Sequence, residues 1–597
     1  YLTELVTQRF NRFTFSMGCG YDYLIDKIVL DNYLCFPYPF LLDVPGHAVS
    51  VEGLPAEERE RNLETLRYIG AQCARRGLSF RLGLWNHSYD YGPQNTHDKY
   101  RVLGVGPDNH ATYCRDALAA LLQAVPEIRG LTFRVHFEGG VPEPTHLFWK
   151  TVLSRIPEAE HLRDIDFHSK GVTDELLEIL TGTGKAFNLS TKFWAEHMGL
   201  PYHQASIRKR EFGKGRQPTV AFQPASDATG TGHHETGVRG MEITHKRSFT
   251  RYGYADFLRD DRPYAIVHRV WPGTQRILTW GDPHMAAGIG RAAGFCGSAG
   301  FEWFEPLSFK GKKGSGVPGG RELYEPEALR LGTRDWTKFR YTYRLWGRLA
   351  YNPEANPESW RRWLRATYGN AAAAVEQALG SASRVLPFVL LTHAPSVANN
   401  VYWPEMYTNI PLVRGSDTVE NPYAREGWSA NADFDMEPPY NFGNTSPLDP
   451  VLVYKVNEFA EDVLQGRRTG RLSPMEIAER MDALADEAER ALAEAESNVP
   501  DTSDLDFRRL AADIRIQSGT GRFFARKFRA ALAYCLYEKN GSDTLLAEAA
   551  SLYRSARDAW TGVVEASEGV YKNDITFGYP PYTRGHWADR IADIDAD

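Results

Sequence analysis

Charged and aromatic side chains collect at the ends of six consecutive apolar runs within the first 310 residues. The run "LTFRVHFEGG" (131–140) starts like a buried strand and then carries three ionisable side chains into two glycines. A strand buried on both faces should be nearly continuous Val, Ile and Leu, because burying an unpaired charge is costly. Six runs that end in this way indicate a site. The residues are Arg81, Trp85 and His87; Arg134, His136 and Glu138; Asp166, His168 and Lys170; Lys192, Trp194, Glu196 and His197; His268, Arg269 and Trp271, with Arg276, Trp280 and Asp282 just beyond; and Glu302, Trp303 and Glu305.

The carboxylates of this set have the chemistry needed to cleave a glycosidic bond. Most glycosidases use two, one that protonates the leaving oxygen and one that assists attack at the anomeric carbon. We predict Glu138 as the general acid, because it follows a cationic stretch and precedes glycines that let a sugar approach the backbone. The predicted base or nucleophile is Glu196, Asp282 or Glu305, and His136 completes the catalytic set.

The cations and the aromatic rings predict an acidic sugar as the partner. Arg binds a carboxylate or sulfate in a bidentate fork, and aromatic faces stack on sugar rings. There are more cations than a neutral sugar needs, although pairing with the nearby carboxylates is the alternative explanation. The predicted cationic residues are Arg81, Arg134, Lys170, Lys192, Arg269 and Arg276; the stacking residues are Trp85, Trp194, Trp271 and Trp303; His87, His168, His197 and Glu302 complete the substrate-binding set.

Two other functions would use the same residues. A lyase or dehydratase would abstract the proton next to the carboxylate of a uronate, with His136, His168, His197 or Lys192 as the base and Arg neutralising the carboxylate. A non-catalytic carbohydrate-binding protein would keep its affinity without turnover. An unsaturated product would identify the first of these functions. Binding that persists without Glu138 would identify the second.

The sequence predicts no metal and no cofactor. The stretch "HHETG" (233–237) lies in a Gly-rich segment, and adjacent His residues there do not have a metal-specific spacing. The glycines of "GIGRAAG" (288–294) lie inside a predicted helix, so they do not form a dinucleotide fingerprint. A nucleophile elbow of the type GxSxG is missing from the sequence as well.

The elements that must position these residues resemble repeated β-α units. Eight apolar runs fit the eight strands of a (β/α)8 TIM barrel, an α/β fold, and helical patterns lie between several of them. Thr173 and Ser473 have the positions of helix N-caps, the latter with Glu476 three residues later. The strand candidates lie near residues 12, 32, 78, 131, 162, 186, 264 and 299. The predicted domains are a catalytic barrel (1–320) with a long loop (205–262), a connecting segment with helices and an aromatic-rich loop (321–460), and an α-helical bundle (461–597).

Composition excludes several classes of partner. The chain has 597 residues and a formal net charge of −7, which argues against nucleic acid and against anionic membranes. The apolar runs are too short to span a bilayer. The six cysteines show neither metal-ligand spacing nor the density of a disulfide framework. The chain begins at Tyr1 and not at Met, which either a removed export signal or trimming of the sequence would explain; on the first explanation we expect a secreted or periplasmic location. The sequence leaves the oligomeric state open.

The sequence resembles the barrel glycosidases that carry a C-terminal helical domain, of which the α-glucuronidases are the nearest type. The resemblance rests on "YDYLIDKIVLDNYLCFPYP" (21–39), on carboxylates at late strands and on the helices that follow the barrel. It implies a glycoside hydrolase with a barrel fold. The fourth strand lacks the Asn-Glu pair common in retaining barrel glycosidases, and the seventh ends in Arg and Trp without a carboxylate. No exact catalytic role is therefore carried over from the family.

Overall fold

The computed structural model describes most of the chain in separate stretches. The described residues are 1–17, 36–89, 101–136, 139–192, 217–220, 241–244, 262–270, 277–294, 297–306, 322–395, 404–407, 410–413, 441–576 and 584–597, with the backbone alone at 192, 217–220, 241–244, 576 and 584.

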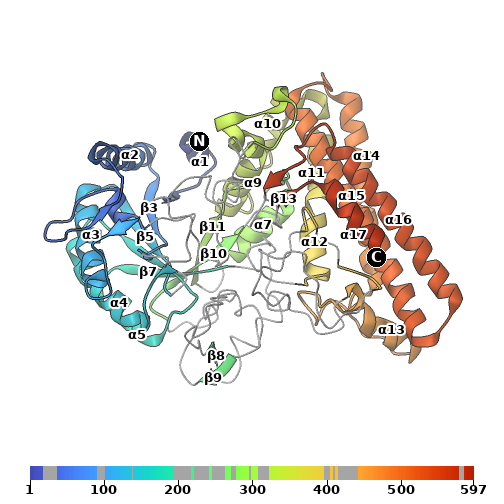
Figure 1. Ribbon diagram of the computed structural model, residues 1–597. Helices are drawn as coiled ribbons and strands as arrows, with labels where there is room; N and C mark the ends of the chain where they lie inside the picture. Colours follow the sequence, from blue (N-terminus) through green and yellow to red (C-terminus); the bar gives the residue numbers. More distant parts are fainter. Residues whose placement is uncertain are drawn as a thin grey trace.

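The first half of the chain forms a sheet of seven parallel strands that curls as a half-barrel (Figure 1). The strands neighbour one another in the order in which they occur along the chain, as expected when each connection is a crossover that carries a helix. They are β1 (Arg12–Ser16), β3 (Ser79–Leu84), β5 (Ile128–Phe133), β6 (Asp164–His168), β7 (Ala186–Lys192), β10 (Ala265–Val270) and β11 (Ser298–Trp303). The helices between them are α2 (Ala56–Ala74), α3 (His110–Ala124), α4 (Thr145–Val152), α5 (Asp174–Gly182) and α7 (Pro283–Ala292).

Seven of the eight predicted strands are thus confirmed, and with them the α/β barrel class. The predicted second strand near residue 32 lies largely outside the described residues, and its described end contains the short 3₁₀ helix η1 (Tyr38–Phe40). In the described part of the chain, three small antiparallel pairs lie outside the sheet. One joins β2 (Ser50–Val51) to β4 (Val102–Leu103), and a second joins β8 (Gln217–Val220) to β9 (Met241–Thr244) inside the predicted long loop. The third joins β12 (Ile575–Thr576) to β13 (Arg584–Gly585) near the C-terminus.

The two faces of the sheet have different chemistry. Side chains alternate between faces along a strand, so every second residue of a strand points to the same side. On the outer face, apolar side chains such as Leu82, Phe133 and Phe167 are fully buried beneath the helices. The inner face carries polar and charged side chains, including Thr132, Asp166 and Arg269, that contact one another across neighbouring strands.

The second half of the chain is helical, which confirms the predicted C-terminal helical region. Ser473 caps α14 with the reciprocal hydrogen bonds of a capping box to Glu476, and Thr173 caps α5, as the sequence predicts. In Figure 1, α7 and α9 lie between the sheet and the long helices α14, α15 and α16. The helices are α9 (Arg340–Tyr351), α10 (Glu358–Tyr368), α11 (Ala372–Ser383), α12 (Val385–Thr392), α13 (Val456–Leu464), α14 (Pro474–Asn498), α15 (Leu505–Asn540), α16 (Asp543–Ser567) and α17 (Ile591–Ala596); a short helix α1 (Leu2–Thr7) precedes the sheet.

Side chains of the helical region hold the segment 277–282, which connects β10 to α7. This segment is buried and lacks a strand partner among the described residues, so its backbone groups need side-chain partners. The helical region supplies these partners at nearly every position. The Glu405 carboxylate accepts hydrogen bonds from the backbone amides of Ile277 and Leu278. The amide of Thr279 donates to Asp513, and the amide of Gly281 donates to the hydroxyl of Ser383. The backbone carbonyls of Thr279 and Trp280 accept hydrogen bonds from Gln517 and Thr342, respectively.

Asp513 is the charged centre of this contact. Its carboxylate lies 2.9 Å from the ammonium of Lys338, accepts a hydrogen bond from Tyr571, and is fully buried. Burial alone would lower the pKa of Lys338, but the Asp513 carboxylate raises that pKa above its ordinary value. Lys338 therefore favours its charged form, and its contact with Asp513 is shielded from water.

We predict that Asp513→Ala strongly destabilises the protein. It leaves a buried ammonium without its counter-ion, a change that costs about 3–5 kcal/mol of unfolding free energy. Denaturant titration followed by circular dichroism measures the loss. Asp486→Ala is the matched control, because the Asp486 side chain is 66% exposed in its pair with Arg522, and we expect it to cost less than about 1 kcal/mol. Equal losses in both variants would contradict the prediction.

Lys527 of α15 is a second buried cation. Its ammonium lies 3.2 Å from the hydroxyl of Tyr407 and 3.7 Å from the carboxylate of Asp597, among aromatic rings. Burial lowers the pKa of Lys527 from 10.5 to about 8, although Asp597 acts in the opposite direction. Between these two pH values the unfolded chain binds a proton that the folded chain does not, so the contribution of Lys527 to stability rises with pH in that window.

The expected signature is a pH-dependent difference between the wild type and Lys527→Met. From about pH 8 upward the wild type should gain stability relative to the variant, by up to about 1.4 kcal/mol per pH unit. Urea unfolding at several pH values from neutral into this window measures the difference. The exposed Lys539 on the same helix provides the control, and the curve of Lys539→Met should run parallel to that of the wild type. Parallel curves for Lys527→Met would contradict the assigned pKa.

Candidate active site

The inner face of the sheet carries two levels of charged residues. At the lower level, near the amino ends of the strands, Arg81 pairs with Asp164, which also lies 3.8 Å from Arg12. The register places Arg81 opposite Gly130, where a Cβ atom would lie 2.8 Å from the guanidinium. The missing side chain at position 130 therefore makes room for the arginine.

The upper level is built around Arg269 of β10 and joins two carboxylates. The Nη2 atom of Arg269 lies 2.9 Å from Oδ2 of Asp166, and its Nε atom lies 2.7 Å from Oε2 of Glu302. Asp166 also accepts hydrogen bonds from the hydroxyls of Thr132, at 2.7 Å, and Ser190, at 3.0 Å. Two nitrogens of one planar guanidinium thus hold the carboxylates within about 8 Å of each other, a separation compatible with the pairs that glycosidases use.

An indole ring covers the arginine. The guanidinium carbon of Arg269 lies 4.2 Å from the ring centroid of Trp85, and the ring of His168 lies 5.8 Å from that of Trp85. A cation over an aromatic face is attracted by the ring quadrupole, more strongly where water is excluded. Trp85 and His168 lie at the carboxyl ends of β3 and β6, so the upper level faces the mouth of the half-barrel.

The two carboxylates have different surroundings. Burial raises the pKa of Asp166 in spite of the positive charges of Arg269 and Arg81. Burial also acts to raise the pKa of Glu302, but Arg269, a hydrogen bond from Thr14 and Arg81 outweigh it and lower that pKa. The Asp166 side chain is 6% exposed and that of Glu302 is 25% exposed. A ligand at the mouth can therefore reach the carboxylate that favours the charged form.

Three buried polar atoms of Asp166 and Arg269 lack a hydrogen-bond partner within the part of the chain that the structure describes. They are Oδ1 of Asp166 and the Nη1 and Nε atoms of Arg269, of which Nε has the ion-pair contact with Glu302. Buried polar groups are normally satisfied, and an exception at a strand end points to a bound water, a ligand group or a proton.

Five further predicted residues lie at the same edge of the sheet. Arg134 and His136 follow β5. His168 is the last residue of β6, Lys170 follows that strand, and Glu305 follows β11. The first four are buried, and Glu305 is half-buried. The structure therefore brings these residues and the Arg269 group to one end of the half-barrel.

Four predicted residues have positions that give them structural roles instead. Arg81 is at the opposite end of the strands, as described above. His87 is fully buried on the outer face against Phe148 and Trp149, and burial lowers its pKa to about 3. Trp303 also points outward, where its ring lies 4.3 Å from that of Tyr343. Asp282 caps α7 and forms an ion pair with Arg384 at 2.7 Å.

The remaining predicted residues lie outside the described side chains. They are Glu138, Trp194, Glu196, His197, Trp271 and Arg276, and Lys192, of which the structure describes the backbone alone. Their predicted roles stay predictions. In the part of the chain that is described, no group of three His, Cys, Asp or Glu side chains is placed to hold a metal, and no helix is long and apolar enough to cross a membrane.

Sequence reasoning gave no role to several residues of the upper level. The sequence marked Asp166 only as a charged residue at a strand end, and no pattern predicted Thr14, Thr132 or Ser190 as site residues. The alternation in "DIDFH" (164–168) is the available sign, because it puts polar side chains at every second position of a strand. These residues became recognisable only when the register placed them beside Arg269.

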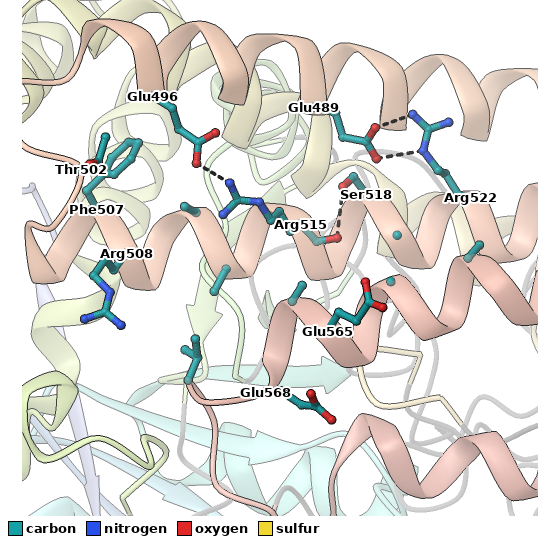
Figure 2. Close-up of a pocket in the computed structure, with 17 residues that line it drawn as sticks. Glu489, Glu496, Thr502, Phe507, Arg508, Arg515, Ser518, Arg522, Glu565 and Glu568 are labelled. Carbon is teal, nitrogen blue, oxygen red and sulfur yellow. Dashed lines mark hydrogen bonds and ion pairs between the residues drawn. The ribbon is translucent and has the colours of Figure 1, made fainter.

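A separate groove of about 690 Å³ lies in the helical region among α14, α15 and α16. Figure 2 shows Glu489 joined to Arg522 and Glu496 joined to Arg515 across this groove. Two of its three arginines are therefore used in holding α14 to α15. No predicted site residue lines the groove.

Comparison with known proteins supports the fold. A solved structure described as a GH138 enzyme targeting pectin rhamnogalacturonan II matches 100% of this chain and 76% of its own, with a TM-score of 0.65 and 14% sequence identity. The structure of CpGH84B matches 89% of this chain and 74% of its own, with 8% identity and a TM-score of 0.24, too low to bear on the argument. The sequence matches no protein-family model and no curated protein. The chain thus shares the barrel-and-helices fold of a glycoside hydrolase, whereas the resemblance to α-glucuronidases stays a prediction.

We predict that Asp282→Asn lowers stability and leaves turnover unchanged. Asn still caps a helix, but it removes the charge that pairs with Arg384, at a cost of about 1–3 kcal/mol. Thermal unfolding and turnover at saturating substrate measure the two effects. Arg384→Gln breaks the same pair and should give a similar loss of stability. A large drop in turnover of a folded Asp282→Asn protein would return Asp282 to the catalytic set.

Proposed function

We propose that this protein is a glycoside hydrolase that acts on acidic carbohydrate. The observation that carries the proposal is the pair of carboxylates, Asp166 and Glu302, held by one arginine near the mouth of a half-barrel. Their surroundings move the two pKa values in opposite directions. Such a difference is typical of sites in which carboxyl groups have separate tasks, here an accessible Glu302 and a supporting Asp166.

The role of general acid belongs to a carboxyl group that carries a proton and touches the leaving oxygen. Burial raises the pKa of Asp166, but the side chain is nearly inaccessible and is held by Arg269, so it supports the site from below. Glu138 remains our choice for the acid because of its place between a cationic stretch and two glycines.

The preference for an acidic substrate rests on two independent supports. Arg134 and Lys170 lie at the carboxyl ends of neighbouring strands, where their charges favour a carboxylate or sulfate on the sugar. The solved protein with the shared fold is described as targeting pectin rhamnogalacturonan II, which is an acidic polysaccharide.

The test is incubation with a panel of pectic, other uronic-acid and sulfated oligosaccharides, with neutral oligosaccharides as the control. We expect products that are together heavier than the substrate by one water, from acidic substrates, and a loss of at least about 100-fold in turnover for Glu138→Ala. Mass spectrometry identifies these products.

Other outcomes would replace the proposal. Cleavage without added water, together with new ultraviolet absorbance, would indicate elimination and one of the predicted bases His136, His168, His197 or Lys192. Binding of an acidic oligosaccharide in calorimetry without any product would indicate a carbohydrate-binding protein. Turnover of neutral substrates alone would overturn the predicted substrate class.

A further inference from the structure

Arg269 is held on several sides by its neighbours in the sheet. It is fully buried, yet its guanidinium reaches a carboxylate on each of two sides and an indole ring on its face. A side chain held by three groups from β6, β11 and the end of β3 has little freedom to turn. Its direction, and therefore the direction of the carboxylate that it holds at the mouth, is fixed by the sheet.

The contacts on the far side of Arg269 anchor it and take no part in reaching a ligand. The Thr132 hydroxyl accepts a hydrogen bond from Nη2 of Arg269 at 2.9 Å and donates one to Asp166. Asp166 is 6% exposed and receives a further hydrogen bond from Ser190. These three residues form a polar platform beneath the guanidinium.

The contact on the near side is with Glu302. Besides the ion pair with Nε of Arg269, the Glu302 carboxylate accepts a hydrogen bond from the hydroxyl of Thr14 on β1. Hydrogen bonds and an opposite charge both favour the ionised form of a carboxyl group. The Glu302 side chain is a quarter exposed and is the accessible member of the group.

We propose that Glu302 is the carboxylate that acts on the substrate in its unprotonated form, and that Arg269 is the positioning residue that aims it and keeps it charged. The inference rests on the proposed function and deepens it, because it names the member of the catalytic pair that opposes the general acid. The unpartnered atoms of Asp166 and Arg269 lie in the same group and favour a polar guest or water beside it.

The first measurement is turnover of the folded Glu302→Gln protein on the best substrate of the panel. Gln keeps the shape but not the charge, so kcat/KM should fall by at least about 100-fold. Asp164→Asn is the matched control, since it removes a carboxylate from the lower level of the same inner face and should keep turnover within about threefold. Hydrolysis that survives in Glu302→Gln overturns the inference and leaves the proposed function standing.

The second measurement is the pH profile of kcat/KM, which reports the pKa values of the essential groups of the free enzyme. It distinguishes a positioning role of Arg269 from a role in stability alone. Thr14→Val removes one hydrogen bond to the charged form, so the acid limb of the profile should move up by roughly half to one pH unit, and Thr14→Ser should restore it. Arg269→Gln should move the limb further in whatever activity remains. An acid limb that stays in place in both variants overturns the role of Arg269.

A third measurement does not depend on turnover. Because the pKa of Glu302 is lowered in the folded state, its ionised form stabilises the protein above the pKa of the unfolded chain, and this contribution disappears as pH falls. The stability difference between the wild type and Glu302→Gln should therefore shrink below about pH 4.5. A wild type without hydrolysis on any substrate overturns the proposed function and with it the catalytic role, whereas a pH-independent difference overturns the positioning role alone.

Discussion

A fully buried guanidinium inside a parallel sheet is the constraint on which the rest of the site depends. Arg269 cannot lose its charge at ordinary pH, and removing it from water is costly unless every side of it meets a counter-charge, an acceptor or a ring. The partners come from different strands: Trp85 from the end of β3, Thr132 from β5, Asp166 from β6 and Glu302 from β11. The arginine meets these partners only if those strands pair in the observed register.

Register and alternation also join the site to the helical region. Glu302 and Trp303 are adjacent in β11, so they point to opposite faces of the sheet. One contacts Arg269 on the inside, and the other packs against Tyr343 of α9 on the outside. A slip of one residue would exchange the two, placing a carboxylate against an apolar helix and an indole against a guanidinium. Strand β11 therefore supplies both the Glu302 carboxylate of the site and, through Trp303, a contact with α9.

The helical region contributes at a second place, just after β10. The segment 277–282 follows the strand that carries Arg269, and its backbone is satisfied by side chains such as Glu405 and Asp513. A buried stretch of backbone that depends on another part of the chain for its hydrogen bonds is stable only when that part is folded. The helices are therefore a structural requirement of the barrel mouth and not an appended module.

The sequence predicted the architecture well because its signals are local. Periodic apolar runs mark strands and helices, and the caps at Thr173 and Ser473 are set by residues one turn apart. Which face a side chain takes, and which partner it meets, depend on registers that no local pattern contains. His87 and Trp303 lie at strand ends, where site residues are expected, but both side chains point outward and pack against aromatic rings. The sequence predicted Asp282 as a catalytic residue, whereas in the structure it caps α7 and pairs with Arg384.

The same reasoning divides the predicted cations into two groups with different capacities. Arg81 is committed to Asp164 and Arg269 to two carboxylates, so neither has a full charge to offer to an anionic sugar. An arginine already neutralised in this way sets the ionisation of its partners, whereas binding an acidic ligand needs positive charge in excess of the fixed carboxylates. In the proposed function that task belongs to other cations, and Arg134 and Lys170 are candidates because they lie at the carboxyl ends of neighbouring strands. The proposal therefore assigns charge selection of the substrate and control of the carboxylates to separate residues.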